Sequence, residues 1–259
     1  MEGLDALAML LMECSPGDAT NRRAAYWDST VKITTIPERC SDDRQRYQGS
    51  GLLLTTDGYF VTNLHVLDAK QATIEFHGGL LGENVYATSL EKRLIKLERY
   101  DLILGKCTIP EAAKEHIVPP VLADKTPGLK DEVRVYGFKH EVVEERVGKV
   151  LGQHGRMRLC ADGSIVTQSY RVFSKSGSGA SLMDNAPEVS WFSDARVEQG
   201  FSGGAVVHAA LGTLMGITVT KLEMTSFLGT VYEHGYIAVD GLRKLLSIYL
   251  RTLGFAIPR

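Results

Sequence analysis

The chain has 259 residues, of which 44% are apolar and 23% are charged, and its formal net charge is −2. This length and composition are typical of a soluble globular protein with a sizeable core, in one large or two small domains. The nearly balanced charge gives no electrostatic basis for binding nucleic acid or an anionic membrane.

The first residues, 1–14, combine an apolar middle with Glu2 and Asp5 and contain no basic segment. This pattern disfavours a secretory signal peptide, and the apolar stretch is too short to span a bilayer. Its leucine spacing predicts a short amphipathic helix. A cytoplasmic location is therefore the expectation.

Four cysteines are scattered along the chain and form no C-x-x-C pair, namely Cys14, Cys40, Cys107 and Cys160. Such spacing argues against a zinc site or a redox motif. Reduced thiols are favoured over disulfides, and we expect neither a metal nor a cofactor.

From Val31 onward, short apolar runs alternate with turn residues, which predicts β-strands in a sandwich or barrel. The predicted strands are 31–36, 50–55, 59–63, 72–76, 132–138, 145–151, 164–173, 191–195, 204–209 and 214–220. Asp57-Gly58 predicts a tight hairpin turn that places His65 just past the second strand of the hairpin.

Later segments depart from this strand pattern. The Ser- and Gly-rich residues 174–189 predict a flexible surface loop. Asp240 predicts the N-cap of a closing helix whose apolar face includes Leu242 and Leu245, with Gly254 as its stop. The Pro-containing stretch 117–128 is a candidate junction between two halves.

The sequence Gly200-Phe201-Ser202-Gly203-Gly204 precedes an apolar strand. A serine needs a base within hydrogen-bond reach to become a nucleophile, and a tight glycine turn can aim the N–H groups of Gly200 and Ser202 at an oxyanion. Taken alone, the same pattern also fits a glycine-rich β-turn.

Two further patterns supply the partners that such a serine needs. His65 follows the strand-like YFVTN, at the edge of an apolar segment, and its ordinary pKa suits proton exchange near neutral pH. Asp101 precedes the apolar LIL and could accept the N–H of His65. A core histidine and a solvent-facing aspartate are the structural alternatives, but the joint order His, Asp, Ser favours a catalytic triad.

Three segments resemble HtrA-type trypsin-like serine proteases. GSGLLLTTDGYFVTNLHVL (49–67) is similar to their histidine segment, RYDLILGKC (99–107) to their aspartate segment, and SDARVEQGFSGGAVV (193–207) to their serine segment. LMGITVT and YIAVDGLRKLL resemble the strand and closing helix that follow, whereas 105–190 matches only loosely. The sequence leaves no room for a PDZ domain after the predicted closing helix, so we expect a protease domain alone.

The resemblance implies an all-β fold of two six-stranded barrels with a C-terminal helix. The short N-terminal helix that the leucine spacing predicts has no counterpart in the family and is expected in addition. The expected units are an extension over 1–30, a first barrel over 31–122, and a second barrel with the helix over 123–259. The resemblance also implies that the protein hydrolyses polypeptide substrates through an acyl-enzyme, without a cofactor. Phe201 cannot form the ion pair that activates digestive relatives.

The sequence is compatible with two substrate specificities. Arg196 and Val197 are expected on one wall of the substrate pocket, and Thr218, Val219 and Thr220 on the other. An inward Arg196 favours an acidic or polar residue before the cleaved bond. An outward Arg196, which an unpaired buried charge makes preferable, leaves the two valines to favour a small or medium apolar residue.

A selective processing endopeptidase is the expected function, and two other functions are alternatives to it. One is a latent or inactive module that binds peptides or a protein partner, with its oxyanion hole collapsed. The other is an esterase of the α/β-hydrolase type, which is disfavoured because that fold orders its triad Ser, Asp, His. A regulatory partner and the oligomeric state stay open.

Overall fold

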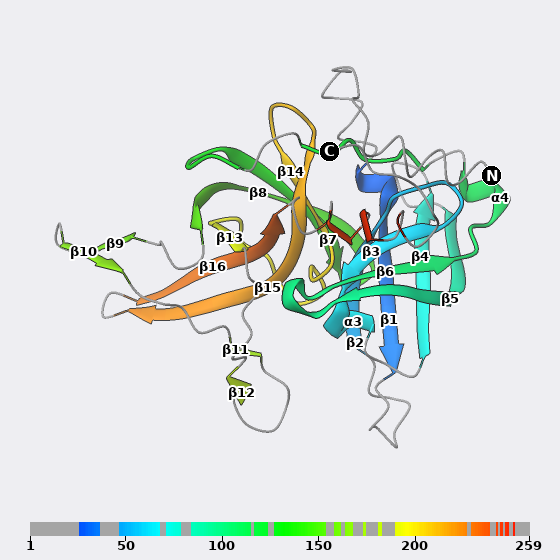
Figure 1. The fold of residues 1–259 in the computed structure, drawn as a ribbon, viewed down its shortest axis with the longest axis horizontal. Coiled ribbons are helices and arrows are strands. Elements are labelled where there is room, and N and C mark those ends of the chain that lie inside the picture. Colours follow the sequence, from blue (N-terminus) through cyan, green and yellow to red (C-terminus); the bar gives the residue numbers. More distant parts are fainter. Residues whose placement is uncertain are drawn as a thin grey trace.

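Two rings of antiparallel strands make up the fold of this protein (Figure 1). The computed structural model describes residues 26–36, 47–67, 71–78, 84–114, 117–123, 127–153, 158–161, 164–167, 173–174, 181–182, 190–226 and 229–238, with positions 242, 244, 245, 247, 248 and 251. No helix within these residues is long and apolar enough to cross a membrane. The predicted helix over 1–14 lies outside them, as does most of the 174–189 loop.

The first ring closes in the order β1-β2-β3-β6-β5-β4. Its strands are β1 (Thr30–Ile36), β2 (Tyr47–Leu53), β3 (Tyr59–Asn63), β4 (Gln71–Gly78), β5 (Asn84–Leu97) and β6 (Leu102–Cys107). Among the described residues it is accompanied by the short helices α3 (Leu64–Leu67), η1 (Glu98–Tyr100) and α4 (Glu111–Lys114), and residues 26–29, directly before β1, are also helical. The predicted Asp57-Gly58 turn joins β2 to β3, and Gly58 takes a φ of +97°.

The second ring closes in the order β13-β16-β15-β14-β7-β8. Its strands are β7 (Glu132–Lys139), β8 (Val142–Gln153), β13 (Ser190–Ser193), β14 (Ala205–His208), β15 (Leu214–Ser226) and β16 (Gly229–Ala238). Two small hairpins lie outside the ring, β9 (Arg158–Ala161) with β10 (Ser164–Thr167) and β11 (Phe173–Ser174) with β12 (Ser181–Leu182). The predicted all-β fold class is confirmed, but the single strand predicted over 164–173 is divided between β10 and β11.

Strands β3 and β6 are buried on both faces because the second ring packs against the first. Phe60 and Ile103 point into the first ring, whereas Val61 and Leu104 belong to an apolar cluster between the rings. That inter-ring cluster also takes residues from the second ring and from the C-terminal helical positions, namely Tyr136, Ala205, Val207, Leu214, Ile217, Val219, Leu242 and Leu245. Each ring also has its own apolar interior.

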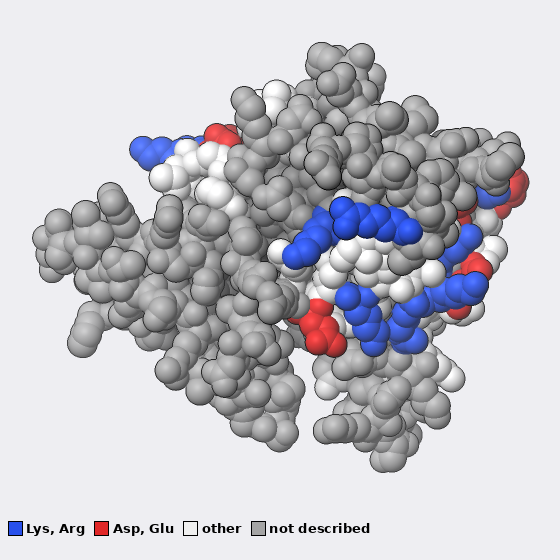
Figure 2. Space-filling model, viewed as in Figure 1, with Lys and Arg blue, Asp and Glu red and all other residues white. Residues whose placement is uncertain are grey.

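Strand β5 was not predicted from the sequence, because charged residues interrupt its apolar pattern. Lys92, Arg93 and Lys96 are exposed along it. Figure 2 shows Lys and Arg side chains gathered where Figure 1 draws β5. Its pairing with β6 also shifts register twice, which breaks the two-residue alternation of a half-buried strand.

Cys107, at the end of β6, is a free buried thiol. Burial raises its pKa to about 12. The thiolate, which is the reactive form, is therefore suppressed at neutral pH.

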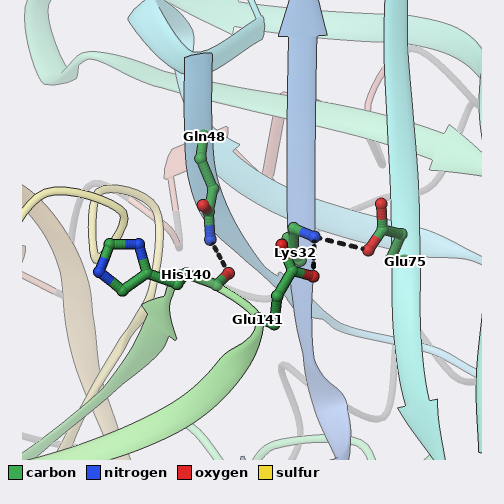
Figure 3. Close-up of polar contacts among 5 residues, drawn as sticks. All are labelled: Lys32, Gln48, Glu75, His140 and Glu141. Atoms are coloured by element: carbon green, nitrogen blue, oxygen red, sulfur yellow. Dashed lines mark hydrogen bonds and ion pairs between the residues drawn. The ribbon is translucent and has the colours of Figure 1, made fainter. Parts of the chain in front are cut away.

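A buried lysine adds a polar link between the rings. Lys32 on β1 is 6% exposed, and its Nζ lies 2.8 Å from Glu75 on β4 and 2.6 Å from Glu141 (Figure 3). Glu141 lies in the turn between β7 and β8, where Gln48 of β2 also donates a hydrogen bond to the carbonyl oxygen of His140. The tip of the β7–β8 hairpin is thus held on the first ring.

We expect the substitution Lys32→Ala to lower the free energy of unfolding by about 1–3 kcal/mol, because it removes the buried cation that contacts both Glu75 and Glu141. Burial lowers the pKa of Lys32, but its hydrogen bonds to Glu141 and Glu75 outweigh that effect and raise the pKa above the ordinary 10.5. The stabilisation is therefore complete below that pH and is lost as the pH rises through the higher folded-state value.

Urea unfolding between pH 6 and 11 measures this difference. The matched control is Lys96→Ala, an exposed lysine of β5, which should change stability by no more than about 0.5 kcal/mol. Equal stability of Lys32→Ala and the unaltered protein at pH 7 would contradict the prediction.

Candidate active site

His65 and Asp101 meet at one end of the first ring. Asp101 Oδ2 lies 2.5 Å from His65 Nδ1, and Asp101 Oδ1 accepts the backbone N–H of His65 at 3.1 Å. The imidazole is therefore held at two points by one carboxylate. The side chain of His65 is 41% exposed, compared with 18% for Asp101, so part of the ring is open to a ligand.

The backbone of Asp101 is as closely held as its side chain. Its carbonyl oxygen accepts the N–H of Leu64 at 3.0 Å and the side-chain amide of Asn63 at 3.1 Å. Its φ is +49°, directly after η1. Aspartate tolerates this left-handed conformation better than most residues, but the conformation still carries strain, which commonly marks a functional site.

Ser202 lies in a turn of the second ring that rests on strand β2 of the first. Its carbonyl oxygen accepts the N–H of Ser50 at 2.7 Å. The neighbouring Gly49 separates Ser202 from helix α3: a Cβ at position 49 would come within 2.7 Å of both methyl groups of Val66 and 3.2 Å from the Ser202 carbonyl oxygen. Val66 directly follows His65, so the serine turn and the histidine helix pack against the same small residue.

Ser50 holds the same turn through its side chain. Its hydroxyl donates to the carbonyl oxygen of Gly200 at 2.6 Å and accepts the N–H of Phe138 at 2.8 Å. All its polar groups are buried and satisfied, since its carbonyl oxygen accepts the hydroxyl of Thr62 at 2.6 Å. One serine of the first ring therefore fixes both ends of the Gly200–Ser202 segment.

The conformation of the turn orients its N–H groups. Phe201 N–H donates to the carbonyl oxygen of Glu198 at 3.2 Å, and Gly200 has a φ of +104°, which together define a type II turn. A type I turn would rotate the Gln199–Gly200 peptide by about half a turn and reverse the Gly200 N–H. Within the described part of the chain, the N–H groups of Gly200 and Ser202 donate to no acceptor.

Gly203 lies in close contact with strand β2 of the first ring. Its φ is +90°, and a Cβ there would come 1.9 Å from the carbonyl oxygen of Ser50. Phe201, beside it, is fully buried in the interior of the second ring. The turn is thus packed from both sides.

Charged residues flank the start of the turn. Lys139 Nζ lies 2.9 Å from the carboxylate of Glu198, and Arg146 lies 3.7 Å from it. The hydrogen bond from Lys139 and the nearby positive charges lower the pKa of Glu198. The carboxylate at the head of the turn therefore stays ionised at neutral pH.

The five residues expected to bind substrate take different positions. Arg196 is exposed, whereas Val197 is buried inside the second ring and Val219 between the rings. The two valines therefore do not share one apolar wall. Thr218 lies directly behind the turn, where its carbonyl oxygen accepts the N–H of Gly203 at 2.7 Å and its N–H donates to Gly204 at 2.8 Å. Thr220 continues β15, and its side chain lies outside the described part.

Sequence reasoning missed Ser50 and Gly49, although both stand in the quoted histidine segment. Their contacts reach residues about 150 positions later in the chain, so no local pattern reveals them. The only available signal was a run of small residues, Gly-Ser-Gly, in an apolar strand. Among the described residues, no group of three or more His, Cys, Asp or Glu is placed to hold a metal ion.

The family model for the trypsin-like peptidase domain matches residues 49–217, about two thirds of the chain. No curated protein sequence matches the chain. Among solved structures, it is similar to the serine endoprotease from Yersinia pestis, with 19% identity and a TM-score of 0.57, covering 92% of this chain and 68% of that one. It is also similar to a protease from M. tuberculosis in its active form, with 17% identity and a TM-score of 0.58, covering 96% and 92%.

We expect Ser50→Ala to lower the free energy of unfolding by about 2–4 kcal/mol, because the carbonyl oxygen of Gly200 and the N–H of Phe138 both lose a buried partner. Urea unfolding measures the loss. Ser29→Ala is the matched control, since the Ser29 hydroxyl also bridges two backbone groups, the C=O and N–H of Val118, away from the Ser202 turn. Unchanged stability of Ser50→Ala would show that these bonds contribute little.

Proposed function

Because the chain belongs to the family of trypsin-like peptidase domains, which are serine endopeptidases, we propose that it cleaves peptide bonds through an acyl-enzyme formed on Ser202. His65 acts as the base, and Asp101 holds it. The observation that carries this proposal is the two-point contact between Asp101 and His65, through Nδ1 and the backbone N–H. A merely structural ion pair would have no need to fix the ring in one orientation.

In the proposed first step, Ser202 Oγ attacks the carbonyl carbon of the substrate while the Nε2 atom of His65 takes the hydroxyl proton. Asp101 accepts a hydrogen bond from the Nδ1–H group, which keeps Nε2 free to act as the base and stabilises the imidazolium that forms. The imidazolium then gives its proton to the leaving amine. In the second half of the reaction, water attacks the acyl-enzyme while His65 again takes a proton, and the acyl group is released from Ser202.

The developing oxyanion is assigned to the N–H groups of Gly200 and Ser202. Support comes from the type II turn and from the lack of a described acceptor for either group. Donors that are already oriented stabilise such charge without reorganisation, which makes them worth several orders of magnitude in rate. In the alternative that the sequence leaves open, a module that binds peptides with its oxyanion hole collapsed, the Gly200 N–H would be reversed.

We also propose a selective processing role in the cytoplasm, because an unrestricted endopeptidase there would degrade other proteins. Selectivity must come from contacts with the substrate side chains. That requirement leads to the inference in the next subsection.

The direct test is covalent labelling with a fluorescent fluorophosphonate, followed by peptide mapping. We expect one adduct on Ser202 in the unaltered protein and none in Ser202→Ala, because only a serine activated by a base reacts readily. A folded protein that fails to label would overturn the proposed activity and favour the binding module.

A second test removes the charge that holds the histidine. Asp101→Asn should slow labelling by roughly a thousandfold or more, since an amide no longer fixes the catalytic tautomer. Asp57→Asn is the matched control, because Asp57 accepts a hydrogen bond from Thr55 in the β2–β3 hairpin, away from His65. Equal rates for the two variants would remove Asp101 from the mechanism.

A further inference from the structure

Three buried polar atoms of the second ring have no hydrogen-bond partner in the part of the chain that the structure describes. They are Trp191 Nε1, Ser193 Oγ and Thr218 Oγ1. Ser193 is 1% exposed and Thr218 is 2% exposed. Buried polar groups are almost always hydrogen-bonded, so an unpaired one needs an explanation.

These three residues, which we call the polar row, share one face of three adjacent strands. Trp191 on β13 and Thr218 on β15 are both register partners of Tyr236 on β16. Ser193 is the partner of His234, two residues away on β16. Cross-strand partners and residues two apart lie on the same face of a sheet, so the unpaired atoms are gathered rather than scattered.

The polar row begins directly behind the nucleophile turn. Thr218 exchanges backbone hydrogen bonds with Gly203 and Gly204, the two residues after Ser202. At the other end, the chain runs from Ser193 through buried Ala195 and Val197 to the same turn. A substrate side chain that enters beside Ser202 therefore meets this face first.

The chemistry of the row selects its ligand. The indole N–H of Trp191 can only donate, whereas the two hydroxyls can donate or accept. The described cations nearby are used elsewhere: Arg196 is exposed, and Lys139 and Arg146 contact Glu198. A carboxylate placed here would be desolvated without a counter-charge, and an aliphatic chain would leave all three atoms unpaired.

We propose that the polar row recognises an uncharged carboxamide, glutamine or asparagine, as the residue before the cleaved bond (P1). The carbonyl oxygen of the amide accepts from the indole and one hydroxyl, and its NH₂ donates to the other hydroxyl. This inference rests on the proposed function for the position of the bond. It rests on residues other than those behind the two specificities that the sequence suggested. The first of these included polar residues but depended on Arg196, and the second depended on the two valines.

The test measures peptide binding rather than cleavage, so that its result does not depend on catalytic activity. In the Ser202→Ala protein, calorimetry compares product peptides that end in Gln, Asn, Glu, Leu or Lys but are otherwise identical. We expect the peptide ending in Gln or Asn to bind at least tenfold more tightly than the one ending in Leu. Tightest binding of Leu, Glu or Lys would overturn the proposal.

Variants assign the effect to the row. Adding Thr218→Val, which removes a hydroxyl at nearly constant shape, should weaken binding of the carboxamide peptide roughly ten- to hundredfold and leave the Leu peptide unchanged. Thr213→Val is the matched control, because Thr213 also carries a buried unpaired hydroxyl but lies between β14 and β15, outside the row. Equal losses in both variants, or none in either, would reject the row as the recognition element.

Two failures remain distinguishable. If fluorophosphonate labels Ser202 but the peptides show no carboxamide preference, the proposed function stands and this inference falls. If labelling fails while the Ser202→Ala protein still selects the carboxamide peptide in a Thr218-dependent way, the row recognises its ligand in a protein that does not cleave.

Discussion

Ser202 and His65, the proposed nucleophile and its proposed base, belong to different rings, so the geometry of the candidate site depends on how the rings are fixed to each other. The hydroxyl of Ser50 makes the decisive contact, since it joins β2 to the carbonyl oxygen of Gly200 and to the N–H of Phe138. The same strand leads through the β2–β3 hairpin to His65. A displacement of β2 would therefore move His65 and the Gly200–Ser202 turn relative to each other, and the buried hydrogen bonds oppose such a displacement.

Local strain is confined to places where neighbouring bonds compensate for it. Asp101 adopts a left-handed backbone, but its two carboxylate oxygens, carbonyl oxygen and N–H are all bonded. Gly200 and Gly203 adopt positive φ values where a side chain would collide with backbone oxygen atoms. Strands β2 and β3, which lead to His65, pair with each other without a register shift. Rigid sheets thus carry the few residues whose conformations are costly.

How much of this could be predicted from the sequence depended on the range of each interaction. The strands around His65 and Ser202 were predictable because apolar alternation and turn residues are local signals. The contact between His65 and Asp101 was expected from their positions at strand edges, and the structure contains it. The contacts of Ser50 were not predictable, since they join residues of two rings. Strand β5 was hidden because its exposed lysines and register shifts obscure the alternation.

The apolar cluster between the rings also determines how the protein unfolds. Leu52, Leu54, Leu102 and Leu104 of the first ring are completely covered, and part of that cover comes from residues of the second ring. A first ring released on its own would expose this whole outer face to water, a cost that its own interior would have to offset. Neither ring is therefore an autonomous domain in the thermodynamic sense. We therefore expect the two rings to share one cooperative unfolding transition, in which the site is lost in the same step as the fold.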